Sequence, residues 1–403
     1  MAQRGCGCFP VKILWLKADF LHPTSRGGQI RTLEMLKRLH RRHEIHYIGF
    51  DDGTSSEAVP RASEYSTRVY PVPHCAPLRG SAAFWGQAVG NLFSPLPLSL
   101  ARYHDAAYGK KVREVQQRES PDVLVCDFLT PAVNLDDLAP WMLFQHNVET
   151  MIWRRHAEHA SGSLQKAYFR GQAERMFQTE ARVCRAVKKV IAVSKNDAAM
   201  HQTLFGLTDV PSVPTGVDTA WLAPPASVAV ETDLVFVGSM DWMPNIDGVG
   251  YFLDEILPLI RRKRPDCSVT IAGRRPPSSL LRRAEGDSKL RVTGTVEDVR
   301  PFLWGSAVSI VPLRIGGGTR LKIYESMAAR VPVVATSIAA EGLEIHPGAD
   351  ICIADTPAGF AEACLNLLED ASERAQMAQA AWMLVSENYS WERVTSDFES
   401  LLA

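Results

Sequence analysis

One stretch, from Ala307 to Thr336, constrains the fold of this chain more than any other, because it contains a complete structural unit. It opens with an apolar, β-branched run, Val308–Leu313, which has the length and composition of a buried strand. Three glycines follow, then a helix that apolar spacing predicts from about Thr319, and then a second buried strand at Val331–Thr336. Strand, glycine loop, helix and strand form a βαβ unit, which requires a parallel sheet.

The loop and helix start of this unit are suited to an anion. Glycines at 316–318 let the backbone approach a ligand closely, and anionic ligands bind at helix N-termini along the carboxyl edge of such sheets. Arg320 and Lys322 lie in the first helical turn, where the helix dipole disfavours a cation by roughly 0.3–1 kcal/mol. A bound diphosphate would explain both cations; the alternative is that both are solvated, with Lys322 pairing with Glu325.

The rest of the chain repeats the alternation of strands and helices in two series. In the first, residues 11–211, the pair Gly27 and Gly28 lies between the first strand and the first helix, where a phosphate can approach the backbone. A segment rich in proline and small residues, 212–227, ends this series, and a second series continues to residue 389. We therefore predict two α/β domains, 11–211 and 212–389, each with a parallel sheet covered on both faces. The longer helices expected in the first domain are Gln29–Arg42, Ala101–Arg118 and one continuous helix from Glu149 towards Val187.

Charge and cysteine content exclude several classes of protein. The chain has 44 basic and 45 acidic residues and a net charge of −1, so no bulk field favours nucleic acid. Apart from the weak Cys6–Gly7–Cys8 pattern, the cysteines have no ligand-like spacing, so we expect reduced thiols of a cytoplasmic protein and no metal site. The N-terminus lacks the apolar core of a signal peptide, and no apolar run is long enough to span a bilayer.

Three motifs carry a family resemblance: the early Gly27–Gly28 loop, the sequence His146-Asn-Val-Glu after a strand, and the segment Tyr324–Thr336. Together they resemble the GT-B retaining glycosyltransferases of family 4, over about residues 11–402. The segment Gly238–Asn245, Gly-Ser-Met-Asp-Trp-Met-Pro-Asn, resembles a subgroup associated with bacterial surface-polysaccharide assembly. The resemblance implies two Rossmann-like domains facing across a cleft, with the C-terminal helix, about 390–403, crossing back to the first. It also implies that the first domain binds the acceptor and the second the nucleotide sugar.

The resemblance assigns roles to single residues. Glu325 matches the family's glutamate that holds the ribose hydroxyls, a task suited to a carboxylate because it accepts from two hydroxyls at once. His146 matches the histidine that contacts the donor sugar; the alternative is a hydrogen-bonded structural histidine. Two expected groups are missing, because Gly317 stands in place of the family's first glutamate and Ser239 in place of an arginine that neutralises the diphosphate.

Other cations are therefore predicted to replace the missing arginine. The predicted catalytic residues are His146, Glu325, Arg320 and Lys322. The predicted donor-binding residues are Gly27, Gly28, Ser239, Arg274, Val296, Gly316, Gly317, Gly318, Thr319 and Leu321. No metal and no cofactor is expected beyond the nucleotide-sugar donor, for which a UDP-sugar is favoured.

The expected reaction is transfer of a sugar to a hydroxyl of a glycan, a lipid-linked glycan or a small glycoside, with retention of configuration. The two alternatives are a GT-B nucleotide-sugar epimerase and a non-catalytic nucleotide-sugar-binding protein. The apolar region Leu78–Tyr103 carries only the charges of Arg79 and Arg102. It either packs on the domain core or forms an acceptor- or membrane-facing patch, which would place the protein at the inner face of the membrane.

Overall fold

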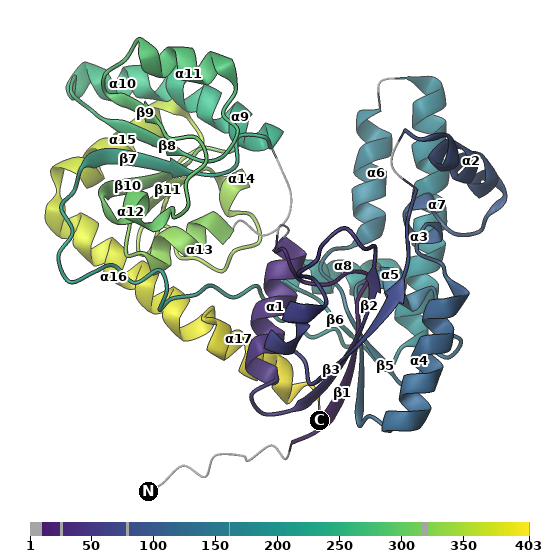
Figure 1. The fold of residues 1–403 in the computed structure, drawn as a ribbon. Helices are drawn as coiled ribbons and strands as arrows, with labels where there is room; N and C mark the ends of the chain where they lie inside the picture. Colours follow the sequence, from purple (N-terminus) through teal and green to yellow (C-terminus); the bar gives the residue numbers. More distant parts are fainter. Residues whose placement is uncertain (1–9, 25–26, 78–79, 161, 316–320, 403) are drawn as a thin grey trace, which may run out of the picture. The chain divides into compact units, whose positions relative to one another are not determined.

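The computed structural model describes residues 10–402 except 25–26, 78–79, 161 and 316–320 (Figure 1). The chain divides into two compact units. The first unit is Met1–Pro214 with Thr395–Ala403, and the second unit is Thr215–Val394. Each unit has its own parallel sheet and its own hydrophobic core.

The first unit contains a six-stranded parallel sheet in the order β3-β2-β1-β4-β5-β6. Its strands are β1 (Lys12–Leu16), β2 (Glu44–Asp51), β3 (Arg68–Pro73), β4 (Val123–Asp127), β5 (Trp141–Phe144) and β6 (Lys189–Ile191). This is the strand order of Rossmann sheets, and the order reverses between β1 and β4. Ligands of such sheets bind at the carboxyl ends of the strands beside this reversal, so residues after β1 and β4 are candidates for a site.

Helices cover both faces of this sheet, as the burial of β1 requires (Figure 1). Leu14 and Leu16 point to the face where α4 (Ala106–Glu119) contributes Tyr108 and Val112. Trp15 points to the opposite face, against α17 (Trp391–Ser400). The other helices of this unit are α1 (Gly27–Leu39), α2 (Ala82–Gly90), α3 (Leu98–Ala101), α5 (Leu129–Ala132), α6 (Glu149–His159), α7 (Ser163–Ala186) and α8 (Lys195–Phe205).

The end of the chain returns to the first unit, as predicted. Phe398 of α17 is fully buried, with its ring centroid 5.5 Å from that of Trp15 and 5.2 Å from that of Phe144. Beside it, Glu399 contacts His43 Nε2 at 2.9 Å and pairs with Arg42. The last turn and a half of α17 thus belongs to a core formed mainly by residues from the beginning of the chain.

The second unit contains another six-stranded parallel sheet, in the order β12-β11-β10-β7-β8-β9. Its strands are β7 (Thr232–Val237), β8 (Val269–Ala272), β9 (Leu290–Val292), β10 (Ser306–Val311), β11 (Val333–Ala335) and β12 (Cys352–Ile353). Counted within the unit, this is the same Rossmann order, with the reversal between β7 and β10. The predicted fold class, two Rossmann-like α/β domains, is confirmed.

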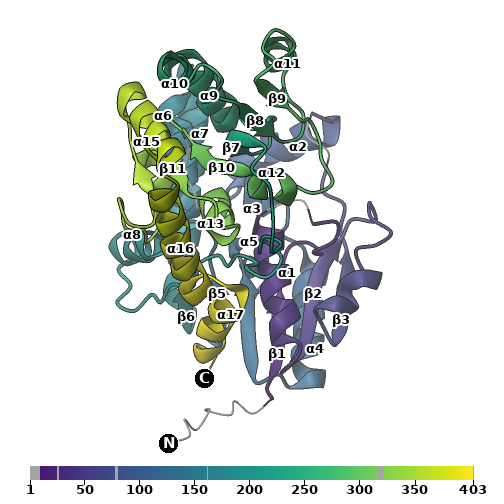
Figure 2. The same cartoon turned by 90° about the vertical axis from the view of Figure 1, so that its left-hand side faces the viewer.

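The helices of the second unit include the predicted βαβ helix α13 (Leu321–Ala328), which packs against α16. The remaining helices are α9 (Met243–Tyr251), α10 (Leu257–Lys263), α11 (Ser278–Glu285), α12 (Arg300–Trp304), α14 (Ser337–Ala340), α15 (Pro357–Glu369) and α16 (Ala371–Asn388). Figure 2 shows α16 followed by α17 at the end of the chain. A short π-helical segment, Phe252–Ile256, joins α9 to α10.

Two expected helices of the first domain were wrong in their extent. The helix expected at Ala101–Arg118 begins only at Ala106, because the Asp105 carboxylate accepts from the Ala107 N–H and caps it there. The helix expected from Glu149 towards Val187 is divided into α6 and α7. Gly162 takes an extended conformation at the start of α7, and glycine is a poor residue for a helix interior.

Candidate functional site

At the carboxyl end of β4, a fully buried carboxylate lies beside the strand-order reversal of the first sheet. Asp127 is the last residue of β4, and its Oδ2 atom accepts from three donors. These are Trp15 Nε1 at 3.0 Å, Lys17 Nζ at 2.9 Å and Thr32 Oγ1 at 2.6 Å. Burial alone would raise the pKa of Asp127, but Lys17 and His146 outweigh it and hold this pKa well below its usual range.

His146 follows β5 and lies against this carboxylate. Its Nε2 atom is 2.8 Å from Asp127 Oδ1, and its side chain is 4% exposed. Burial lowers the pKa of His146 to about 3, although Asp127 acts in the opposite direction. The imidazole is therefore neutral at physiological pH. Its Nδ1 atom is buried and has no hydrogen-bond partner among the described residues.

Phe128, the residue after Asp127, has a strained backbone. Its φ of 73° and ψ of 166° lie in a region that is almost restricted to glycine and costs roughly 1–3 kcal/mol. Its ring lies 4.0 Å from the His146 ring and beneath Lys17 Nζ, at 4.6 Å. A Cβ built on Gly28 would lie 3.1 Å from the Phe128 ring and 3.4 Å from His146 Nδ1. The predicted residues Gly28 and His146 are thus brought together, with Gly28 facing the free ring nitrogen; Gly27, the first residue of α1, is exposed.

Arg31, on the second turn of α1, is a functional candidate that the sequence did not indicate. It is 6% exposed, and its Nε atom is buried without a partner among the described residues. Burial lowers the pKa of Arg31 to about 10, with Asp127 and Asp197 opposing the shift. A buried guanidinium without an ion-pair partner is suited to an anion of a ligand.

Glu149, at the start of α6, is a second candidate that the sequence did not indicate. Burial raises the pKa of Glu149 to about 7, and the nearby charge of Glu180 adds to the shift. Glu180 is fully buried and accepts from the backbone N–H groups of Glu149 and Thr150, at 3.0 and 2.8 Å. It also accepts from Gln145, so Glu180 fixes both sides of the His146 loop.

In the second unit, the predicted residue Lys322 reaches the carboxyl end of β7. Its Nζ atom is 2.7 Å from Asn245 Oδ1 and 4.4 Å from the centre of the Phe236 ring. A Cβ on Gly238 would lie 2.8 Å from this Nζ, so the glycine leaves room for the cation. Asn245 also donates to the Ser239 carbonyl at 2.7 Å. The segment Gly238–Asn245 thus holds Lys322 at the strand-order reversal of the second sheet.

Two more predicted residues meet at the same edge. Arg274, after β8, donates from Nε to Ser239 Oγ at 2.7 Å. Both side chains also contact Asp241, which lies 2.5 Å from Ser239 Oγ and 3.4 Å from the Arg274 guanidinium. The structure thus brings the Arg274 guanidinium to the side chain of Ser239. Val296 is half-buried in the loop after β9, at the carboxyl end of this strand, which is the neighbour of β8 in the sheet.

Glu325 lies in α13, one turn after Lys322. Burial raises the pKa of Glu325, and Lys322 opposes the shift. Its carboxylate makes no hydrogen bond or ion pair within the described part of the chain. Leu321 begins α13 and is half-buried. The predicted residues Gly316, Gly317, Gly318, Thr319 and Arg320 lie outside the described residues.

The region Leu78–Tyr103 does not pack on the core along α2. No residue of α2 is buried, and Trp85 is 62% exposed. In the turn that follows, Leu92 is 53% and Phe93 90% exposed. Arg175 of α7 donates to the carbonyls of Asn91 and Leu92 and thereby fixes this turn to the unit.

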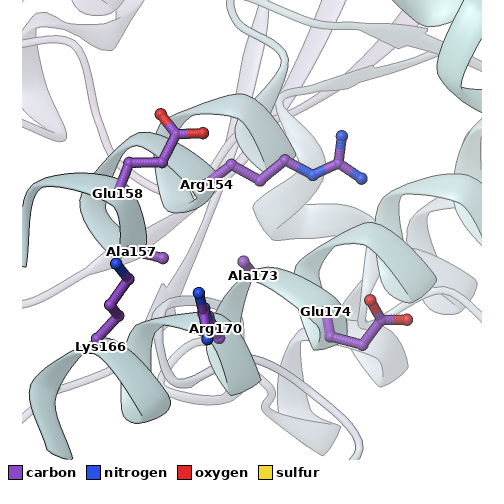
Figure 3. A pocket seen from close by; sticks show the side chains of 7 residues that line it. All are labelled: Arg154, Ala157, Glu158, Lys166, Arg170, Ala173 and Glu174. Carbon is purple, nitrogen blue, oxygen red and sulfur yellow. The ribbon is translucent and has the colours of Figure 1, made fainter. Parts of the chain in front are cut away.

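A pocket of about 490 Å³ lies between α6 and α7 (Figure 3). Its lining combines three cations and two carboxylates around two alanines: Arg154, Lys166, Arg170, Glu158, Glu174, Ala157 and Ala173. The pocket lies along the helices and not at the strand ends, so its position is not that of a nucleotide in a Rossmann fold.

Within the described ranges, no group of three or more His, Cys, Asp or Glu side chains could hold a metal ion. No helix in the part of the chain that the structure describes is long and apolar enough to cross a membrane.

Sequence comparison matches both units to known families. Residues 25–221 match the model described as Glycosyltransferase Family 4, and residues 231–370 match that described as Glycosyl transferases group 1. A protein of Klebsiella pneumoniae described as an uncharacterized 44.6 kDa protein in the cps region is 22% identical over 401 residues. The match covers 96% of this chain and 98% of that relative.

Solved structures share the fold over almost the whole chain. HepE of Anabaena, in complex with UDP and glucose, has a TM-score of 0.63 at 15% identity, covering 97% of this chain and 99% of that chain. Sucrose-phosphate synthase of Thermosynechococcus elongatus has a TM-score of 0.64 at 12% identity, covering 97% and 98%. TarM has a TM-score of 0.66 at 11% identity, covering 97% and 98%.

The fold and the matched domains define the chain as a glycosyltransferase with the GT-B fold. More particularly, its first unit carries the family 4 domain and its second unit the group 1 domain.

Proposed function

We propose that the protein transfers a sugar from a nucleoside diphosphate donor, with a UDP-sugar favoured, to an acceptor hydroxyl with retention of anomeric configuration. The observation that carries this proposal is the carboxyl edge of the second sheet, where Lys322 lies beside Glu325, whose carboxylate has no partner among the described residues, and where Arg274 contacts Ser239. A carboxylate can accept from both ribose hydroxyls, and the two cations can neutralise a diphosphate. HepE, which shares the fold, was solved with UDP, and this favours the uridine nucleotide.

The remaining donor contacts are assigned by position along the same edge. Val296 and its loop would lie against the base, and Ser239 beside the phosphates. The backbone of residues 316–319 and the Arg320 side chain would contact the diphosphate, and Leu321 would begin the helix directed at it. In the first unit, Gly27–Gly28 and His146 would approach the donor sugar, and Arg31 would contribute to charge stabilisation.

A same-face substitution assisted by the leaving phosphate is the proposed route to retention. The carboxylate nearest to His146 is Asp127, and it is fully buried and held by three donors. Such a group is unavailable as a nucleophile toward the anomeric carbon. Charge that develops on the diphosphate would be stabilised by Lys322, Arg320 and Arg274.

We propose an acceptor that combines an apolar part with an anionic group, as a lipid-linked glycan does. The exposed side chains of Trp85, Leu92 and Phe93 form an apolar patch, here named the α2 patch. The pocket of Figure 3 supplies cations between α6 and α7, and α6 begins three residues after His146. This arrangement fits an enzyme at the inner face of a membrane that assembles a surface polysaccharide.

Calorimetry with UDP and with uridine tests the donor site. Lys322→Gln removes the charge while an amide can still reach Asn245, so UDP affinity should fall by roughly 10-fold or more and uridine affinity should change little. Lys289→Gln, at the amino end of β9, is the matched control. Equal loss of uridine and UDP binding would show general damage and not a phosphate contact.

Product analysis separates the proposed function from its two alternatives. A transferase forms a glycoside only when donor and acceptor are both present; an epimerase isomerises the sugar of the donor without acceptor; a binding protein does neither.

His146→Ala should lower turnover by roughly 10²-fold or more while UDP affinity is retained. Turnover per folded molecule equal to that of wild type would return His146 to a purely structural role.

A further inference from the structure

The buried pair Asp127 and His146 lies in an environment that differs between the two carboxylate oxygens. Asp127 has two oxygen atoms with different surroundings: Oδ2 faces three donors, and Oδ1 faces only His146 Nε2. Oδ1 and Nε2 approach each other to ion-pair distance, and both are buried without a hydrogen bond of regular geometry among the described residues. A buried polar atom without a partner costs roughly 1–3 kcal/mol, so alignment of Nε2–H with Oδ1 across their 2.8 Å separation is favoured.

The direction of the proton in this contact is set by charge. Asp127 is ionised and accepts only, so the shared proton must belong to His146 Nε2. A neutral imidazole has one proton, and its Nδ1 atom then carries a lone pair. Two nearby cations, Lys17 and Arg31, disfavour a second proton on the ring.

Nδ1 is buried, and the residue on one side of it is a glycine, which has no side chain. The Phe128 ring, 4.0 Å away, and the Phe144 ring, 4.7 Å away, hold the imidazole between them. Gly28 lies on the remaining side, and any Cβ there would come within 3.4 Å of Nδ1. The ring is thus fixed in orientation, with its acceptor atom directed at the glycine loop after β1.

We propose that Asp127 is a positioning residue, which accepts a hydrogen bond from the Nε2–H group of neutral His146 and so presents Nδ1 as a hydrogen-bond acceptor for a hydroxyl of the substrate sugar. This inference rests on the proposed function, since it names the atom through which His146 acts. The hydroxyl donates its proton to Nδ1, and no charge is formed. The Phe128 ring keeps the imidazole in place, and this role explains why the backbone of Phe128 is strained.

Asp127→Asn tests the proposal because it reverses the proton. The amide oxygen must stay with the donors Trp15, Lys17 and Thr32, so the amide NH₂ group turns to His146 Nε2. His146 must then accept at Nε2 and carry its proton on Nδ1, which can no longer accept from a hydroxyl. We expect the ¹⁵N NMR signals of His146 to change from the Nε2–H to the Nδ1–H tautomer. We also expect kcat to fall by roughly 10²–10⁴-fold, with UDP affinity within twofold of wild type.

Asp350→Asn is the matched control. Asp350 is 3% exposed and contacts His346 Nδ1 at 2.8 Å, but it lies in a loop before β12. This variant should keep wild-type kcat and leave the His146 signals unchanged. If Asp127→Asn does not fold because Lys17 loses its partner, Lys17→Met/Asp127→Asn retains Trp15 and Thr32 as donors and should show the same tautomer change.

Three results would overturn the proposal: an Nδ1–H tautomer in wild type, an Nε2–H tautomer in the folded Asp127→Asn variant, or a changed tautomer with wild-type kcat. The tautomer is read from the free protein without substrate. Failure of the proposed function would appear separately, as absence of sugar transfer by the wild-type protein.

Discussion

At the scale of single residues, the charges of this protein are placed where strand ends converge. Lys322 enters a space left by Gly238, and Arg274 supplies a guanidinium at Ser239. In the first unit, Asp127 and Lys17 are both almost fully buried. Buried pairs of this kind contribute little net stability, since desolvation offsets their attraction, but removing one partner is costly. We therefore expect the pair of Asp127 and Lys17 to orient neighbouring side chains more than it stabilises the fold.

The first prediction concerns Glu325. Glu325→Gln keeps the shape of the side chain but weakens acceptance from two hydroxyls, so we expect a loss of about 1.5–3 kcal/mol in UDP affinity. Calorimetry on the folded variant measures this, with Glu362→Gln, exposed on α15, as the control. Unchanged affinity would remove Glu325 from the nucleotide site.

The second prediction concerns the pH dependence of stability at Glu149. Burial raises the pKa of Glu149 from 4.5 to about 7, so between these values the folded state holds a proton that the unfolded state has released. The free energy of unfolding should therefore fall as pH rises from about 4.5 to about 7, by about 2 kcal/mol after allowance for partial exposure. Urea denaturation at several pH values measures this.

Glu149→Gln cannot lose a proton, so its decline should be smaller than that of wild type, and it should exceed wild type in stability at pH 8. The decline that remains belongs to Glu180, because burial raises the pKa of that group too. Glu158→Gln, an exposed change on the same helix, should follow the wild-type curve. A Glu149→Gln curve parallel to that of wild type would contradict the assignment.

At the scale of elements, the start of α6 and the exposed helix α2 carry the candidate functional features of the first unit. Glu180 of α7 accepts from the first N–H groups of α6 and so caps a helix that lacks a side-chain cap of its own. The same carboxylate fixes Gln145, the residue before His146. By contrast, α2 buries none of its residues, although it is one of the most apolar segments of the chain.

The third prediction concerns the α2 patch. If it contacts a membrane, Trp85→Ser/Phe93→Ser should reduce co-sedimentation with anionic phospholipid vesicles several-fold, because exposed aromatic side chains contribute much of interfacial binding. The double change should not alter stability, since Trp85 and Phe93 are 62% and 90% exposed. Met383→Ser, which alters a 45% exposed side chain of α16, should bind vesicles as wild type does. Equal sedimentation of all three proteins would assign the patch to another partner.

At the scale of the whole molecule, the chain enters the first unit twice. β1 and α17 are separated by more than 370 residues in sequence, yet Trp15 and Phe398 are in contact. Loop-closure entropy grows only slowly with length, so such a late return is inexpensive for the folded state. The consequence is that the first unit is incomplete until the last residues of the chain are present.

The fourth prediction tests this dependence. Phe398→Ala should lower the stability of the first unit by about 3–5 kcal/mol, the usual loss for a buried phenylalanine. Hydrogen exchange should show faster opening of β1 and β5 than in wild type, with β10 and β11 unchanged. Phe93→Ala, on a 90% exposed side chain, should alter neither. Equal acceleration in both sheets would show that the two units unfold together.

The sequence by itself determined the fold class of this protein and proposed candidate residues for its site. Apolar periodicity and glycine loops are local signals, and they sufficed to predict two α/β domains with parallel sheets and the βαβ unit that carries Lys322 and Glu325. Tertiary structure alone decided the exposure of α2 and the partners of Asp127. The carboxylate of Asp127 accepts from Trp15, Lys17 and Thr32 and contacts His146. These four partners come from three other segments of the chain. The spacing of these residues along the chain does not predict that they form a group. The order of the strands in the sheet, and not distance in the sequence, brings them together.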